Sequence, residues 1–147
     1  MRSGLILAMV LMLGGCAFFH PVADVRVTAG ESVNPDSGER PSPVLLRVYE
    51  LRSRDAFQDA GFDALHDDPE AALGEDLVGM EETMLRPGGS WQTERALQEG
   101  TRYLGVTAAF RNIDDARWRV TRPTDGIFFV PGIDLRVDGV EIRDRDD

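Results

Sequence analysis

The chain has 147 residues, of which 42% are hydrophobic, and 26 acidic against 16 basic residues give it a formal net charge of −10. This balance repels nucleic-acid phosphates, and because no local basic stripe interrupts it, nucleic acid is excluded as a partner. The length suits one domain with one hydrophobic core. Cys16 is the single cysteine, so no disulfide is available and packing must hold the fold.

The first fifteen residues have the form of a secretory signal peptide. Arg2 supplies one positive charge, and the apolar run over residues 5–13 is shorter than the roughly 20 residues that span a bilayer. The run ends in Leu13-Gly14-Gly15-Cys16, which resembles the lipobox of bacterial lipoproteins. This resemblance implies that residues 1–15 are cleaved and that Cys16 receives acyl chains such as palmitate. The alternatives are a plain signal peptide or an uncleaved anchor.

The residue after the cysteine bears on the membrane that receives the chain. Ala17 is not the aspartate that retains lipoproteins at the inner membrane of many Gram-negative bacteria, so we expect the periplasmic face of the outer membrane. We expect residues 16–22 to be a lipidated tether, residues 23–143 to be the folded domain and residues 144–147 to be a charged tail.

A long loop follows the first expected strand. Residues 23–29 alternate apolar and polar side chains, as a strand with one buried face does. Residues 30–43 then hold three prolines among other turn formers, and a loop of about fourteen residues is long against a median of roughly five. The prolines lower the entropy cost of ordering, so we interpret this loop as a presented binding loop, and we expect removal of residues 33–39 to spare folding. Arg40 either captures a partner carboxylate or pairs with neighbouring acids.

Residues 44–51 are rich in β-branched and aromatic side chains, which predicts a central strand buried on much of both faces. Residues 53–75 are expected to form a helical insertion. Ser53 is the expected cap of its first helix, and Asp68-Pro69 is expected to start another, with Gly74 after its end. Three apolar side chains are spaced to face the sheet from these helices: Phe57, Phe62 and Leu65.

The rest of the chain returns to short strands, which we expect at residues 77–85, 90–97, 103–110, 118–120, 127–130, 133–137 and 140–142. Asp138-Gly139 between the last two predicts a tight hairpin with a two-residue turn. Val48 and Phe110 lie in the middle of apolar strands and are expected core residues. About eight short strands with one helical insertion indicate an all-β fold, a β-sandwich.

Residues that could carry chemistry are scarce. His20 and His66 are the only histidines, and no nucleotide-binding or hydrolase motif is present. The carboxylates Asp67-Asp68 and Glu81-Glu82 are typical of a solvated face rather than of a metal site or an acid–base pair. We therefore predict no enzyme, cofactor or metal site, and we interpret four aromatic residues as packing residues: Trp91, Trp118, Phe128 and Phe129.

Several stretches, kept in order along the chain, carry a resemblance to a known family: Asn34-Pro35-Asp36-Ser37-Gly38-Glu39-Arg40-Pro41-Ser42-Pro43 with residues 44–51, then Phe57, Phe62-Asp63-Ala64-Leu65, Leu73-Gly74-Glu75-Asp76-Leu77, Leu85-Arg86-Pro87-Gly88, residues 103–111 and Trp118-Arg119. They resemble the TssJ family, also called VasD or SciN, the outer-membrane lipoproteins of the bacterial type VI secretion system. Two departures are His66, where a tryptophan is expected, and Glu39, which separates Gly38 from Arg40.

The resemblance implies a transthyretin-like β-sandwich of two four-stranded antiparallel sheets, with helices inserted after the second strand. It also implies a structural role, in which the lipoprotein anchors the secretion membrane complex and its other subunits by binding the periplasmic C-terminal domain of TssM. The family contact is the loop between the first two strands, which here includes Asn34, Pro35, Asp36, Ser37, Gly38, Glu39, Arg40, Pro41, Ser42 and Pro43. The alternative function is a periplasmic transthyretin-like carrier that binds a small molecule in an apolar pocket.

Overall fold

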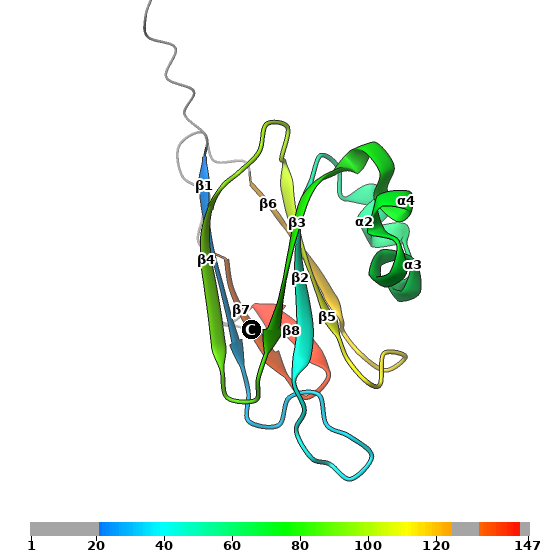
Figure 1. The fold of residues 1–147 in the computed structure, drawn as a ribbon, viewed down its shortest axis with the longest axis vertical. Coiled ribbons are helices and arrows are strands. Elements are labelled where there is room, and N and C mark those ends of the chain that lie inside the picture. Colours follow the sequence, from blue (N-terminus) through cyan, green and yellow to red (C-terminus); the bar gives the residue numbers. More distant parts are fainter. Residues whose placement is uncertain (1–20, 125–132, 145–147) are drawn as a thin grey trace, which may run out of the picture.

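The computed structural model describes residues 21–124 and 133–144. The strands of these residues form two four-stranded sheets, in the orders β4-β1-β7-β8 and β3-β2-β5-β6. The first sheet contains β1 (Val22–Ala29), β4 (Ser90–Ala96), β7 (Ile133–Asp138) and β8 (Glu141–Asp144). The second contains β2 (Val44–Leu51), β3 (Leu77–Leu85), β5 (Tyr103–Ala109) and β6 (Arg119–Pro123). The two sheets face each other (Figure 1), which confirms the β-sandwich.

One pair of strands departs from the expected antiparallel sheets. β1 and β7 run parallel, with Val25 opposite Ile133 and Ala29 opposite Val137, so the first sheet is mixed. The physical reason lies in the connection, because β7 follows β6 of the opposite sheet and no tight hairpin fixes its direction. The other paired strands are antiparallel.

The predicted strand boundaries agree with the structure to different degrees along the chain. β2 and β3 occupy the predicted residues, and β2 lies inside its sheet with most side chains buried. The last hairpin is shifted, because Asp138 pairs with Glu141 and the two-residue loop is therefore Gly139-Val140. Gly139 adopts a positive φ of 53°, which suits glycine at the first position of a two-residue hairpin loop. The strand expected at residues 127–130 lies outside the described residues.

The main core fills the space between the sheets. Val48 and Phe110 are both buried in it, as predicted. The other members include alternate residues of β1, β2, β5 and β7, whose inward side chains meet across the sandwich. Trp91 and Trp118 are half-buried and pack against this core, which confirms their interpretation as packing residues.

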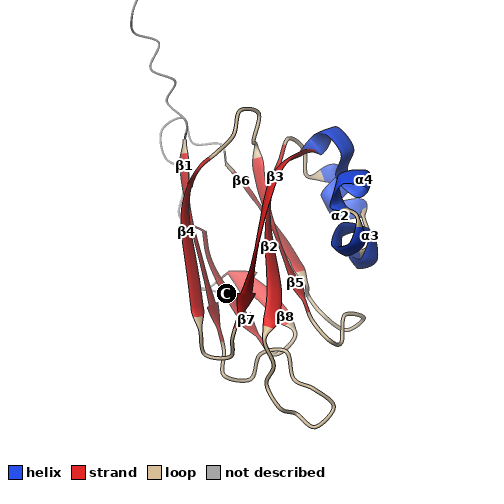
Figure 2. Ribbon diagram, viewed as in Figure 1, coloured by secondary structure: helices blue, strands red, loops and turns tan. Residues whose placement is uncertain are grey.

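Short helices cover the outer face of the second sheet (Figure 2). They are α2 (Asp55–Asp59), α3 (Phe62–Asp67), α4 (Pro69–Leu73) and the 3₁₀ turn η2 (Gly74–Asp76). A second apolar cluster holds them there, in which Phe57 and Leu65 pack with Tyr49 of β2. Gly105 of β5 permits the contact, because a β-carbon at that position would lie 2.8 Å from the Phe57 ring.

Helix capping agrees with the prediction at one helix and not at the other. Asp68 Oδ1 accepts a hydrogen bond from Ala71 N at 3.0 Å, and Pro69 is the first residue of α4, as expected. The predicted cap at Ser53 is wrong, because α2 starts at Asp55 and its N-cap is Arg54. The Ser53 hydroxyl instead accepts from Asp55 N at 3.2 Å, a local turn that competes with capping.

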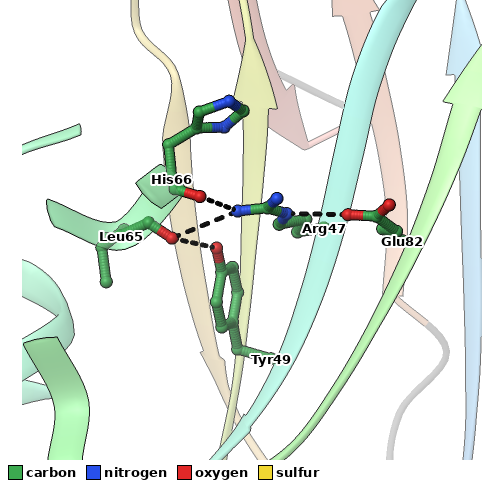
Figure 3. A network of polar contacts seen from close by, with 5 residues as sticks. All are labelled: Arg47, Tyr49, Leu65, His66 and Glu82. Atoms are coloured by element: carbon green, nitrogen blue, oxygen red, sulfur yellow. Dashed lines mark hydrogen bonds and ion pairs between the residues drawn. The ribbon is translucent and has the colours of Figure 1, made fainter. Parts of the chain in front are cut away.

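Arg47 of β2 joins the sheet to the helical insertion (Figure 3). Its Nη1 donates to the carbonyl oxygens of Leu65 at 3.3 Å and His66 at 2.6 Å, near the end of α3, and its Nε donates to Glu82 at 3.0 Å. Tyr49 OH donates to the same Leu65 carbonyl at 3.2 Å. Desolvation lowers the pKa of Arg47, but the hydrogen bond to Glu82 and the neighbouring groups outweigh it, so the pKa is raised and the charge is fixed.

Candidate partner-binding site

The long loop between β1 and β2 extends from the end of the sandwich where β1 finishes (Figure 1). β1 begins at Val22, at the opposite end of the sandwich, and its eight residues span roughly 26 Å at about 3.3 Å per residue. The loop therefore lies far from the start of the folded domain. Its outermost residues are exposed, as a presented loop requires.

The apex of this loop, residues 36–40, is closed by its own side chains. Asp36 Oδ1 accepts hydrogen bonds from Gly38 N at 2.8 Å and Arg40 N at 3.0 Å, and its Oδ2 accepts from Arg40 Nε at 2.9 Å. Asp36 N donates in turn to Arg40 O at 2.9 Å. The hydrogen bond to the Arg40 side chain is the main cause that lowers the pKa of Asp36, so the carboxylate stays charged and the apex stays folded on itself.

Arg40 pairs with a neighbouring acid of the loop, Asp36. The Arg40 side chain is 82% exposed, and its Nη2 lies 2.7 Å from Asp36 Oδ2. An exposed ion pair of this kind contributes little to stability. It does hold the guanidinium in one orientation, with a face open to solvent.

The base of the loop is anchored by Asn34, which is only 3% exposed. Its side-chain Nδ2 donates to Pro43 O at 2.7 Å, its Oδ1 accepts from Arg111 N at 2.8 Å, and its backbone N donates to Gly139 O at 2.6 Å. The residue adopts φ 50°, a left-handed conformation that asparagine tolerates better than most residues. Asn34 therefore ties the loop to two other loops, to Arg111 through its side chain and to Gly139 through its backbone.

Burial divides the predicted site residues into two groups. Asn34 and Ser42 are buried and form the framework, whereas Pro35 and Asp36 are half-buried. The exposed residues that remain for a partner are Ser37, Gly38, Glu39, Arg40, Pro41 and Pro43. The expectation that residues 33–39 can be removed without loss of stability is wrong in physical terms, because Val33 is fully buried in the main core and Asn34 anchors the base.

Sequence reasoning missed Arg111 and Val140, which lie beside the loop. Arg111 follows β5 and is 77 residues from Asn34, to whose side chain its backbone donates. No local pattern marks such a residue, because only the sheet topology brings the loops together. The Asp138-Gly139 turn signal did predict a tight loop in the sequence, but not that this loop lies beside Asn34.

Other groups singled out in the sequence have packing roles. The His66 ring stacks on Phe62 with centroids 5.2 Å apart, and Phe62 meets Trp118 edge-on at 5.3 Å, so the histidine extends an aromatic row.

Within residues 21–124 and 133–144, no three His, Cys, Asp or Glu side chains are grouped so that they could hold a metal ion. The described helices include none long and apolar enough to cross a membrane. Cys16 and the aromatic pair at residues 128–129 lie outside the described residues, as does His20.

A sandwich with a filled interior and one self-closed, exposed loop defines a class of small β domains built to present a loop region. Hollows of about 520, 770 and 390 Å³ lie at the surface of the described residues, where helix, loop and strand residues line them. The chain belongs to the family of type VI secretion lipoproteins that includes VasD, EvfM and TssJ, whose family model matches residues 21–132.

Solved structures agree with this assignment. The lipoprotein TssJ1 of Pseudomonas aeruginosa is 35% identical, with 85% of this chain and 95% of that chain covered at a TM-score of 0.70. Lip of Serratia marcescens, a membrane-bound component of the type VI secretion system, is 27% identical, with 86% and 96% covered at a TM-score of 0.75. A chain in a structure from EAEC described as the TssM C-terminal domain shares the fold, at 23% identity, 83% and 95% coverage and a TM-score of 0.73. A comparison with curated proteins found no match.

Proposed function

We propose that this chain is an outer-membrane lipoprotein that anchors the type VI secretion membrane complex by binding the periplasmic domain of TssM through the β1–β2 loop. The observation that carries the proposal is the self-closed apex at residues 36–40, which presents exposed side chains on a loop already ordered. Order before binding reduces the entropy cost of association. Family membership and the occurrence of this fold in a structure described as the TssM C-terminal domain support the choice of partner.

The proposal includes the membrane attachment. Residues 1–15 act as the cleaved signal, Cys16 carries the acyl chains, and several chains together give stable anchoring. Val22 lies six positions after Cys16, so the tether reaches roughly 20 Å when extended. Because the β1–β2 loop leaves the far end of the sandwich, it points away from the anchored end and into the periplasm.

The action we propose is binding rather than catalysis. The exposed residues of the predicted site include two charged groups, Glu39 and Arg40, beside small and proline residues, a set suited to recognition. A carrier would need an apolar pocket with a few convergent polar groups. The space between the sheets is instead occupied by the core side chains, and no observation favours a carrier over an anchor.

The test is a calorimetric titration of the mature chain carrying Cys16→Ser with the purified TssM periplasmic domain. The titration is repeated with an apex variant in which Gly-Gly replaces residues 36–40. The hydrogen bond between Asp36 N and Arg40 O shows that the two ends of this segment lie close together, so two residues can join them. The buried Val33 and Asn34 are retained. We expect this variant to fold and to lose binding. Unchanged affinity would place the TssM contact on another part of the sandwich. The matched control is Arg102→Gln, a change at an exposed residue beside β5 at the tether end.

A further inference from the structure

Three loops meet at the end of the sandwich that carries the apex. Asn34 binds the backbone of Arg111 after β5 and the backbone of Gly139 between β7 and β8. The β5–β6 loop and the β7–β8 loop are also joined directly, because Arg117 N donates to Val140 O at 3.1 Å and Ile142 N donates to Arg117 O at 2.8 Å. The three loops therefore form one prestructured surface rather than independent flaps.

An open groove of about 770 Å³ lies between these loops, and its lining residues are Pro35, Asp36, Ser37, Arg111, Asn112 and Val140. Pro35 and Val140 are half-buried and give it apolar walls. Ser37 and Asn112 are exposed and give it neutral hydrogen-bonding groups. The lining thus combines apolar and polar groups, and it includes Asp36 and Ser37 of the apex.

Arg111 supplies the positive charge of this groove, and that charge also helps to lower the pKa of Asp36. The Arg111 side chain is exposed and has no hydrogen bond or ion pair to any residue within 21–124 and 133–144. Asp36, the acid that lines the groove with it, already accepts two hydrogen bonds at Oδ1 and contacts Arg40 through Oδ2. The Arg111 guanidinium therefore keeps its fork of donors for a carboxylate that comes from outside the chain.

We propose that this groove is a second contact for the periplasmic partner, and that it takes an extended segment of that protein carrying a carboxylate next to an apolar side chain. The carboxylate pairs with Arg111, and the apolar side chain packs between Pro35 and Val140. The inference rests on the proposed function and extends the partner surface from the apex to all three loops.

The position and charge of the groove favour a protein over a lipid surface. The groove lies at the end of β1 opposite Val22, so it faces away from the tethered end. The chain has a net charge of −10, and an acidic protein is repelled by anionic headgroups. The Arg111 guanidinium, in a groove that the apolar Pro35 and Val140 also line, suits one carboxylate on a peptide.

The test compares Arg111→Gln and Arg111→Lys with the control Arg102→Gln, each in the mature chain carrying Cys16→Ser, by calorimetric titration with the TssM periplasmic domain. We expect Kd to rise at least tenfold for Arg111→Gln and less for Arg111→Lys, which keeps the charge and loses the fork. Kd should be unchanged for Arg102→Gln. The melting temperatures should match, because the backbone N–H of residue 111 that binds Asn34 remains. The wild-type Kd should also rise with salt more steeply than that of Arg111→Gln.

Each other outcome has one meaning. If both Arg111 variants bind like wild type while the Gly-Gly apex variant does not, the groove proposal is wrong and the proposed function stands. If neither the apex nor Arg111 matters, both are wrong. An equal loss for Arg102→Gln would show an effect of net charge alone and overturn the groove. Retention of the unlipidated chain on phosphatidylglycerol vesicles through Arg111 would identify a lipid ligand and also overturn it.

Discussion

At the scale of single residues, Asn34 is the side chain on which the loop surface depends. Asn34→Ala leaves Pro43 O and Arg111 N without their partner and places an alanine at φ 50°. We expect the free energy of unfolding to fall by about 2–4 kcal/mol, from unsatisfied buried groups and left-handed backbone strain. Urea denaturation measures the change, with the exposed Ser37→Ala as a control near zero. A loss below about 1 kcal/mol would show that the loop base is held by other contacts.

Asp36 gives the apex a pH dependence whose sign is fixed. The Arg40 hydrogen bond lowers the pKa of Asp36 below its ordinary value of 3.8, so the folded state favours the charged form. The charged carboxylate therefore stabilises the folded state at pH values above its ordinary pKa. This stabilisation is lost as the pH falls through the lower pKa of the folded state. We expect Asp36→Asn to melt below wild type at pH 7 and the difference to shrink steadily below about pH 4. A difference that stays constant with pH would contradict the assignment.

At the scale of elements, the helical insertion is attached by Arg47 as well as by its apolar face. Arg47→Met keeps most of the length of the side chain and removes the donors to the Leu65 and His66 carbonyls. We expect a loss of about 1.5–3 kcal/mol, the usual range for hydrogen bonds to a charged group, and faster amide exchange in α3. Exchange in β5 should be unchanged under native conditions. Equal acceleration in both elements would mean that the insertion and the sheet open together.

The two sheets are also joined by one buried charge. Glu50 of β2 is fully buried, its Oε1 lies 2.8 Å from Arg95 Nη2 of β4, and its Oε2 accepts from Gln98 N at 2.8 Å and Thr101 Oγ1 at 2.7 Å. Glu50→Ala leaves the half-buried Arg95 without this acceptor, so we expect a loss of about 3–5 kcal/mol in chemical denaturation. Glu50→Gln keeps an acceptor and should lose less. Equal losses would show that packing rather than charge dominates there.

The elements also show where sequence patterns suffice. Residues 44–51 and 77–85 could be placed as strands because their side chains settle the periodicity locally. The parallel pairing of β1 with β7 could not be predicted in this way, since the two paired strands lie more than a hundred residues apart in the chain. Arg111 was missed for the same reason: its place beside Asn34 follows from topology and from no motif of its own.

At the scale of the whole molecule, the two ends of the sandwich have different tasks in the proposed anchor. The chain enters the fold at Val22, and the loop surface around Asn34 lies at the other end of β1. We therefore expect that a change at Cys16 leaves partner binding at the apex intact, and that a change at the apex leaves lipid attachment intact. Tethering requires both at once.

The measurement that tests this account most directly is co-flotation of the TssM periplasmic domain with vesicles that carry the lipidated chain. We expect TssM to float with wild-type vesicles, to stay in solution when the chain carries Cys16→Ser, and to stay in solution when Gly-Gly replaces residues 36–40 in a chain that itself still floats. Flotation of TssM with that apex variant at the wild-type level would contradict the central claim that the β1–β2 loop anchors the complex.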